Sequence, residues 1–189
     1  NTILGEERVV VFDEAGTTRD SIYIDFERGE QKYTIIDTAG IRRKGRVTDK
    51  LEKFSVLKAI QAISEAQVVV LVLDAHLDIA EQDATIVGYA LEAGKSIVVA
   101  INKWDNLNDD QRLKIKSDLK EKLHFIDFAK YNYISALYKK GTNDLLDSIA
   151  AAYTSAFVKF STPKLTRVLK EAVDRQPPTF KGNFRPKMR

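Results

Sequence analysis

The sequence has no cysteine in its 189 residues and only two histidines, His76 and His124. The lack of cysteine excludes a disulfide scaffold, a thiolate metal site and a cysteine nucleophile. The shortage of histidine disfavours a zinc site built from imidazoles. Hydrophobic residues make up 44% of the chain and charged residues 30%, which excludes a disordered protein and fits a soluble globular one.

Long hydrophobic runs are also missing. The longest is 68–73, far shorter than the roughly 20 residues of a membrane-spanning helix. The first residues, Asn1 to Arg8, lack the basic-then-apolar order of a signal peptide. We therefore expect a cytoplasmic protein with no membrane partner.

Proline and positive charge are scarce until late in the chain. All four prolines fall after residue 162, and residues 164–189 carry eight basic and two acidic side chains, a net charge of +6. The preceding residues carry a net charge of −3. Two composition shifts at one place predict a boundary near Ser161, with one domain over 1–160 and the start of a second over 161–189.

Strand and helix patterns alternate before that boundary. Strands are expected as a hairpin at 21–26 and 31–36, then at 68–73, 96–101 and 131–134. Helices are expected at 51–63, 81–92, 109–123 and 143–158, and after the boundary at 165–173. This order predicts an α/β fold in which a mostly parallel sheet carries helices on both faces. The hairpin should add an antiparallel edge strand, and both apolar runs should be buried on two faces.

Three details of these helices can be predicted. The 51–63 helix should bury an apolar stripe that includes Leu57 and Ala59. Asn143 should cap the last helix of the first domain, and Gly94 should end the helix before the second apolar strand.

Four short motifs lie at the ends of the expected strands, where ligands bind in such sheets. They are Gly16-Thr17-Thr18-Arg19-Asp20, Asp37-Thr38-Ala39-Gly40, Asn102-Lys103-Trp104-Asp105 and Ser135-Ala136-Leu137. Each motif alone is weak evidence, because turns and helix caps use the same residue types. All four in this order are specific.

The third and fourth motifs suit a guanine base. The two acceptor oxygens of Asp105 match the N1–H and the N2 amine of guanine, whereas adenine has no 2-amino group. Asn102 can tie its loop to a neighbour, and the stem of Lys103 can lie over the base. The Ala136 backbone N–H suits guanine O6, since a small side chain permits close approach.

The first and second motifs suit a phosphate and a metal. Asp37 can hold Mg²⁺ through water, Gly40 lets an N–H reach a γ-phosphate, and Thr18 can reach both when a loop closes. We predict Thr18 and Asp37 as metal residues. The predicted GTP-binding residues are Thr17, Thr18, Asp37, Thr38, Ala39, Gly40, Asn102, Lys103, Asp105, Ser135, Ala136 and Leu137.

These motifs resemble the second to fifth motifs of the translation-factor-related P-loop GTPases, in their Era-like branch. The run Asp37 to Gly45, followed by Leu51 to Ser55, resembles the second G domain of the bacterial Der (EngA) GTPases. The tail, from Pro163 through Pro177-Pro178 to Arg189, resembles the opening of that family's C-terminal KH-like domain.

The resemblance implies a P-loop NTPase-type G domain over 1–160 and the beginning of an α/β KH-like domain over 161–189. It implies a monomeric switch that hydrolyses GTP with Mg²⁺ during assembly of the large ribosomal subunit. GTP, GDP, the large subunit and its RNA are the implied partners.

The sequence departs from the family at the phosphate side. The P-loop pattern GxxxxGK[ST] is absent, and Gly94-Lys95-Ser96 should close a helix and open a strand instead. We expect the chain as given to lack the first strand and the P-loop, and to bind GTP poorly or not at all. Ile41 stands where Ras-type enzymes place a water-orienting glutamine, so no catalytic residue is named. The family implies that a bound K⁺ can supply positive charge.

Two rival interpretations remain open. A degenerate G-like domain could bind only RNA or protein, although Asn102 and Asp105 would then have no guanine to contact. A different Era-like GTPase, acting in tRNA modification, would lack the basic segment. The tail itself could be an RNA surface or the solvated face of a helix.

Overall fold

A computed structural model describes residues 22–37 and 49–179 of the chain. The chain divides into two compact units, residues 1–156 and residues 157–189. The break between the units comes shortly before the composition shift at Ser161.

Three parallel strands form the centre of the first unit. They are β3 (Val68–Asp74), β4 (Ser96–Asn102) and β5 (Lys130–Tyr133), in the order β3-β4-β5. The middle strand is predicted correctly as a buried one, since Val98, Val99 and Ala100 are 0% exposed. A continuous apolar run is typical of a strand covered on both faces.

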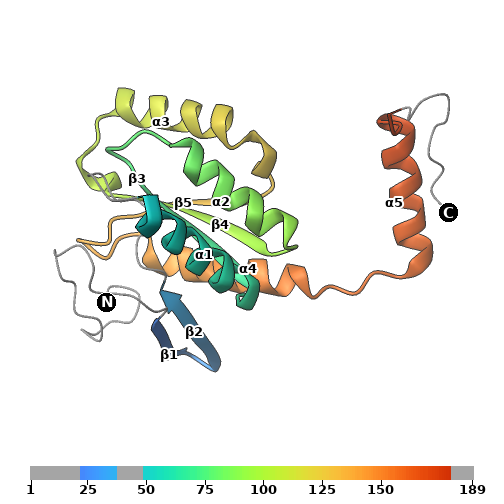
Figure 1. Ribbon diagram of the computed structural model, residues 1–189, viewed down its shortest axis with the longest axis horizontal. Helices are drawn as coiled ribbons and strands as arrows, with labels where there is room; N and C mark the ends of the chain where they lie inside the picture. Colours follow the sequence, from blue (N-terminus) through green and yellow to red (C-terminus); the bar gives the residue numbers. More distant parts are fainter. Residues whose placement is uncertain (1–21, 38–48, 180–189) are drawn as a thin grey trace. The chain divides into compact units, whose positions relative to one another are not determined.

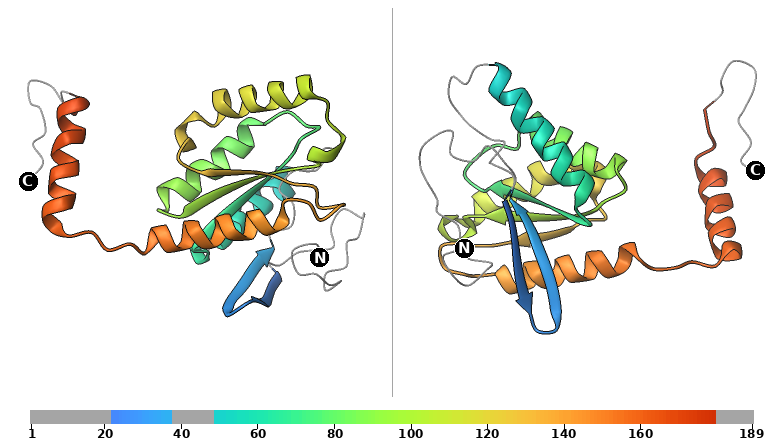
Figure 2. Two further views of the ribbon diagram at one scale, coloured as in Figure 1. Left: turned by 180° about the vertical axis from the view of Figure 1, so that it is seen from behind. Right: turned by 60° about the horizontal axis from the view of Figure 1, so that its bottom comes forward.

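Helices cover both faces of this sheet (Figures 1 and 2). These helices are α1 (Asp49–Glu65), α2 (Glu81–Glu92), α3 (Asp109–Lys122) and α4 (Thr142–Ala156). Alternate side chains of β4 separate two core clusters, as the pleat requires. Ile97, Val99 and Ile101 pack with α1, α2 and α3, whereas Val98 and Ala100 pack with α4. The predicted α/β architecture is confirmed.

The prediction that the 68–73 run is buried on both faces is wrong. Leu73 is 4% exposed, but Val72 is 60% exposed. On the face that Val72 shares, Val68 and Val70 pack against the α4 cluster, and this cover does not extend to Val72. On this face the strand is therefore covered at its amino end and open near its carboxyl end, while Leu73 on the other face is buried.

The hairpin consists of β1 (Ile22–Arg28) and β2 (Gln31–Asp37). The expectation that it adds an edge strand to the main sheet is wrong, because among the described residues it forms a separate two-stranded sheet. Side chains, not ladder hydrogen bonds, join it to the helices. The Tyr23 hydroxyl donates to Glu65 of α1 at 2.7 Å, and Arg28 pairs with Asp147 of α4 at 2.7 Å.

Two helix details differ from the sequence predictions. In α1 the buried side chains include Ala59 and Ile63, whereas Leu57 is 62% exposed. Leu57 lies two positions before Ala59, about 200° around the helix, so it faces away from the core. Asn143 is not a cap, because α4 begins one residue earlier, at Thr142.

The end of α2 is predicted correctly. Gly94 has a φ of 67°, and the Lys95 N–H bonds back to the Ala90 carbonyl at 3.0 Å. This is a Schellman-type helix end, which favours glycine at the left-handed position. Lys95 and Ser96 then enter β4, so Gly94-Lys95-Ser96 closes a helix and opens a strand, as predicted.

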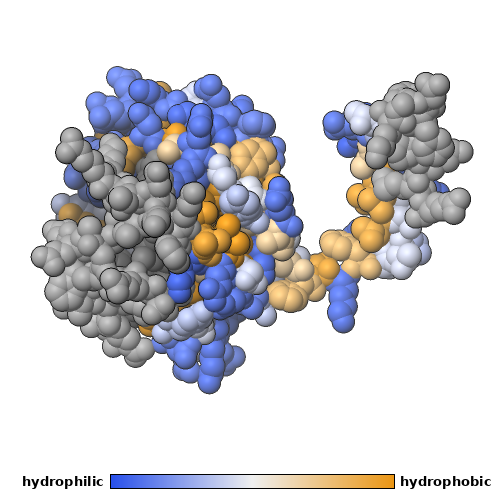
Figure 3. Space-filling view, in the orientation of Figure 1, coloured by the Kyte–Doolittle hydropathy of each residue, from blue (hydrophilic) through white to orange (hydrophobic). Residues whose placement is uncertain are grey.

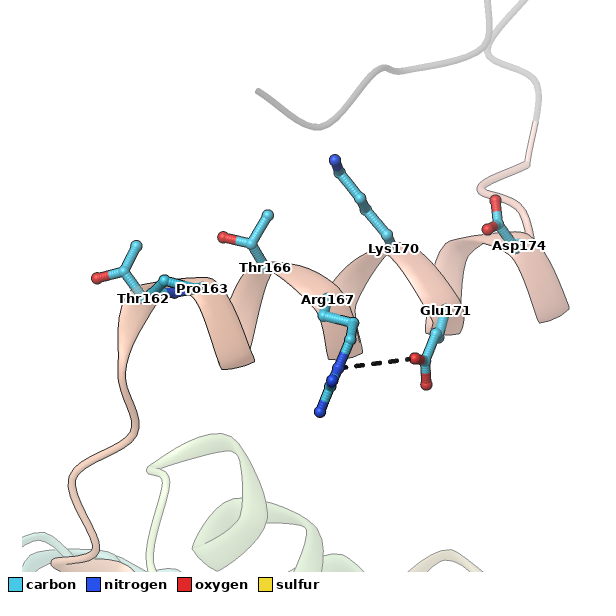
Figure 4. A pocket seen from close by; sticks show the side chains of 7 residues that line it. All are labelled: Thr162, Pro163, Thr166, Arg167, Lys170, Glu171 and Asp174. Carbon is cyan, nitrogen blue, oxygen red and sulfur yellow. Dashed lines mark ion pairs between the residues drawn. The ribbon is translucent and has the colours of Figure 1, made fainter.

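The second unit contains one described helix, α5 (Thr162–Arg175). Three of its apolar side chains, those of Leu165, Val168 and Leu169, are 45–50% exposed. Hydrophobic surface is visible on this helix in Figure 3. Polar side chains line a shallow groove elsewhere on the helix, where Arg167 and Glu171 form an ion pair of 4.0 Å (Figure 4). Among the described residues, no helix is long and apolar enough to cross a membrane.

Candidate functional site

The carboxyl ends of β4 and β5 bring two of the predicted motifs together. Asn102 is the last residue of β4, and its Oδ1 accepts a hydrogen bond from the Ala136 backbone N–H at 2.9 Å. The two residues are 34 positions apart in the chain. One side chain therefore couples the loop after β4 to the loop after β5.

Backbone hydrogen bonds extend this coupling. The Ile134 N–H donates to the Ile101 carbonyl at 2.8 Å, and the Trp104 N–H donates to the Ile134 carbonyl at 3.1 Å. Parallel pairing of β4 and β5 thus continues into the loops, which fixes their relative position.

The loop after β5 is closed on itself. Ser135 is 2% exposed, and its backbone N–H and carbonyl each bond to Lys140, both at 3.0 Å. Gly141 has a φ of 72°, and a Cβ there would lie 2.7 Å from the Tyr133 carbonyl oxygen. Only glycine fits this close approach, so the sequence at 141 helps to set the loop that presents Ala136.

Asp105 lies in the short 3-10 helix η1 (Trp104–Asn106) that follows β4. It is half-buried, and its carboxylate has no hydrogen-bond or ion-pair partner among the described residues. Burial of a carboxylate is costly unless donors satisfy its oxygens. This acceptor pair is therefore suited to a ligand that brings two N–H donors.

An aromatic cluster packs against η1 and holds it in place. The Trp104 ring lies 4.3 Å from the Tyr133 ring, centroid to centroid, at an interplanar angle of 35°. The Arg112 guanidinium lies 5.8 Å from the Trp104 centroid, and the Lys116 ammonium lies 5.3 Å from that of Tyr133. Burial raises the pKa of the Tyr133 hydroxyl above its usual range. Trp104 thus packs against the domain, and the sequence analysis gave it no such role.

Lys103 connects the site to a third strand. Its backbone is left-handed, with φ 64° and ψ 32°, a conformation that costs a non-glycine residue about 1–2 kcal/mol. Its ammonium group forms an ion pair of 2.7 Å with the Oδ2 of Asp74, the last residue of β3. Burial by itself raises the pKa of Asp74. The hydrogen bonds from Lys103 and from the His76 backbone outweigh it and lower that pKa below its usual range.

The sequence analysis missed Asp74. A signal for it exists, since Asp74 follows the apolar run of its strand as Asn102 follows the run of the next one, and the two are register partners in the parallel sheet. The rule of inspecting residues at strand ends would have found it.

The structure brings together one part of the predicted site. Asn102 and Ala136 are hydrogen-bonded across the ends of β4 and β5. Lys103 and Asp105 follow Asn102 in the loop after β4, and Ser135 precedes Ala136 in the loop after β5, where Leu137 is 77% exposed. Asp37 ends β2 and pairs with Ile22. The remaining predicted residues lie outside the described ranges: Thr17, Thr18, Thr38, Ala39 and Gly40. The described residues therefore include the base side of the predicted site and, of its phosphate side, Asp37 alone.

The chemistry of the predicted metal donors fits Mg²⁺. Thr18 and Asp37 offer hydroxyl and carboxylate oxygens, and Mg²⁺ is commonly held by one or two carboxylates with phosphate oxygens and water. No group of three or more carboxylate, imidazole or thiol side chains that could hold a metal occurs in the part of the chain that the structure describes. A site completed by phosphate oxygens and water does not need such a group.

Comparison with known proteins places the chain in a family. The family model described as "50S ribosome-binding GTPase" matches residues 1–103. The chain belongs to this family. GTPase Der of Chromobacterium violaceum is 61% identical over the whole of this chain, which covers 40% of that relative's length. GTPase Der of Neisseria meningitidis is 60% identical over the whole of this chain, which covers 39% of its length. The predicted resemblance to Der is thus confirmed, and the chain spans about two fifths of the length of these relatives.

Solved structures of GTPases share the fold. Era, in complex with MgGDPNP and nucleotides of 16S ribosomal RNA, matches with a TM-score of 0.63 and 22% identity, over 100% of this chain and 56% of Era. Elongation factor SelB of Methanococcus maripaludis, in complex with a GTP analogue, matches with a TM-score of 0.61 and 19% identity, over 77% of this chain and 30% of SelB. At these identities the similarity shows a shared fold alone.

Proposed function

We propose that this chain provides the guanine-binding side of a GTPase that, in the intact protein, hydrolyses GTP to GDP and phosphate. The observation that carries the proposal is the half-buried Asp105 carboxylate, which has no partner among the described residues and stands beside the coupled Asn102 and Ala136. Membership of a GTPase family supports the same activity.

Guanine satisfies this site better than the other bases. Its N1–H and N2 amine can both donate to Asp105, a charge-assisted pair of hydrogen bonds. Its O6 can accept from the Ala136 N–H, in competition with the Asn102 oxygen that now accepts it. Adenine offers no 2-amino group and would place its N1 lone pair against the carboxylate, so the site discriminates against it.

The phosphate side of the proposal rests on Thr18, Asp37 and Gly40. Asp37 and Thr18 would hold Mg²⁺, and Mg²⁺ supplies positive charge to the phosphate oxygens when it is bound. Ile41 cannot orient water, which is why K⁺ remains part of the proposal and no side chain is assigned as a base.

We further propose that the intact protein acts in the cytoplasm as a switch in assembly of the large ribosomal subunit. The family description names 50S ribosome binding, and the net charge of +6 over residues 164–189 favours contact with RNA phosphates. Relatives named GTPase Der support the GTPase part of this proposal.

The test is equilibrium binding of GDP and ADP to the intact gene product in Mg²⁺, with Asp105→Ala as the variant that removes this site. We expect GDP to bind at least about 10³-fold more tightly than ADP at this site, since buried acceptors reject ligands that lack the matching donor. Asp118→Ala, which removes a carboxylate from α3, is the matched control. If Asp105→Ala binds as many nucleotides as the wild-type protein and still binds 50S subunits, the result would instead support the RNA- or protein-binding interpretation.

A further inference from the structure

The Asp74 carboxylate is held by two groups at once. Its Oδ1 accepts from the His76 backbone N–H at 2.9 Å, and its Oδ2 pairs with the Lys103 ammonium at 2.7 Å. The two interactions use different oxygens, so together they hold the carboxylate in one orientation.

We propose that Asp74 is a positioning residue for nucleotide binding, which holds the Lys103 side chain in place for contact with the guanine base. This inference rests on the proposed function, because only a bound guanine nucleotide gives the Lys103 stem a base to cover.

The backbone around Asp74 supports this role. Asp74 and Asn102 are register partners at the ends of β3 and β4, and the Ala75 N–H donates to the Asn102 carbonyl at 3.0 Å. The Leu77 N–H donates to the Asp74 carbonyl at 3.0 Å, which closes a turn after the strand. The carboxylate is thus fixed relative to the residue that begins the guanine-binding motif.

Lys103 needs such a partner more than most surface lysines. Its side chain is 57% exposed and extends from a left-handed backbone, whereas the Asp74 side chain is 25% exposed. A free lysine side chain samples many rotamers, and ordering it on binding opposes affinity. An ion pair with a fixed carboxylate orders the stem before the nucleotide arrives.

Two other roles predict different behaviour. A surface ion pair with no functional role contributes little, and its removal would leave nucleotide affinity unchanged. A purely electrostatic role would place a negative charge near the phosphates, so its removal would strengthen GTP binding more than GDP binding. Positioning over the base predicts an equal loss for both nucleotides.

The decisive variant is Asp74→Asn, because asparagine can still accept from the His76 N–H but carries no charge for Lys103. In the intact protein we expect GDP and GTP each to bind about 5–10-fold more weakly. Glu171→Gln is the matched control, since it removes the carboxylate of the Arg167–Glu171 pair in α5 and leaves every residue of the predicted site unchanged. The thermal midpoint of each variant confirms that the protein remains folded.

A double-mutant cycle separates positioning from a general structural effect. Lys103→Met keeps an apolar stem and removes the ammonium group. If Asp74 acts through Lys103, Asp74→Asn should add less than about a twofold loss of GDP affinity in the Lys103→Met background.

Each alternative result is informative. Unchanged GDP affinity in Asp74→Asn, an additive loss in the double mutant, or stronger GTP binding would overturn the positioning role and leave the proposed function intact. If the wild-type protein binds no GDP at a site that Asp105→Ala removes, the proposed function fails, and the positioning role fails with it.

Discussion

The loops after β4 and β5 and the β1–β2 hairpin are held in very different ways. The loops continue the pairing of buried strands, with Asn102 bonded to Ala136 and Trp104 packed on Tyr133. The hairpin has its own ladder and is joined to α1 and α4 by the exposed contacts of Tyr23 and Arg28.

This difference has a direct consequence for the proposed site. The base side is built on β4, the most buried of the described strands, so it is preorganised for its ligand. The hairpin connects the segments that carry the two predicted phosphate-side motifs, around residues 16–20 and 37–40. Exposed polar contacts contribute little to stability, so the two described side-chain contacts hold the hairpin less firmly than strand pairing holds the base side.

The largest effect should come from removing the aromatic anchor of the base side. Trp104→Ala should lower the free energy of unfolding by about 2–3 kcal/mol, since it leaves a gap against Tyr133. Chemical unfolding followed by circular dichroism measures this change. Phe128→Ala, at a ring that is 62% exposed, is the control and should change the stability by less than about 1 kcal/mol. Equal effects would show that the η1 turn is not anchored by its tryptophan.

A smaller effect is expected from uncoupling the two loops. Asn102→Ala removes the acceptor of the Ala136 N–H and should lower the free energy of unfolding by about 1–2 kcal/mol. It should also weaken GDP binding to the intact protein by at least about 10-fold, measured by equilibrium titration. Asn106→Ala, which removes an exposed asparagine of η1, is the control and should leave both quantities unchanged within error. A loss of stability without loss of affinity would contradict the role of this coupling in base recognition.

The smallest effects should come from the hairpin. Tyr23→Phe and Arg28→Ala should each shift the thermal midpoint by less than about 2 °C, because both contacts are exposed. The hydrogen bond from Tyr23 lowers the pKa of Glu65 below its ordinary value of 4.5. This contribution to stability is therefore present above pH 4.5 and is lost as the pH falls below it. A large shift in either variant would show that the hairpin is anchored as firmly as the base side.

Much of this difference could be predicted from sequence. The apolar run of β4 and the glycine end of α2 are local signals, and both predictions are confirmed. The exposure of Leu57 and of Val72 could not be predicted, because it depends on which helix covers which part of the sheet. The separate hairpin sheet is also a matter of tertiary arrangement, since β-branched alternation predicts strands but not their neighbours.

The candidate site also has parts that the sequence predicted and parts that it did not. Its motifs predicted residues that the structure brings together at the ends of β4 and β5, including Asn102 and Ala136. The motifs did not predict the partners of those residues. Asp74 and Tyr133 support Lys103 and Trp104 from other strands, and such pairings become visible only when the strands are in register.

The most direct test of the central claim exchanges the donor pattern of the base. Asparagine at position 105 would offer one acceptor and one donor, which matches the N1–H and the C2 carbonyl of xanthine in place of the guanine amine. In the intact protein carrying Asp105→Asn, we expect GDP affinity to fall by about 10²-fold and XDP binding to appear. Because the change lies in this chain, XDP binding reports on this site alone. The assignment of Asp105 as the residue that recognises guanine would be contradicted by one result. In that result the Asp105→Asn protein remains folded, binds GDP as before and gains no XDP binding.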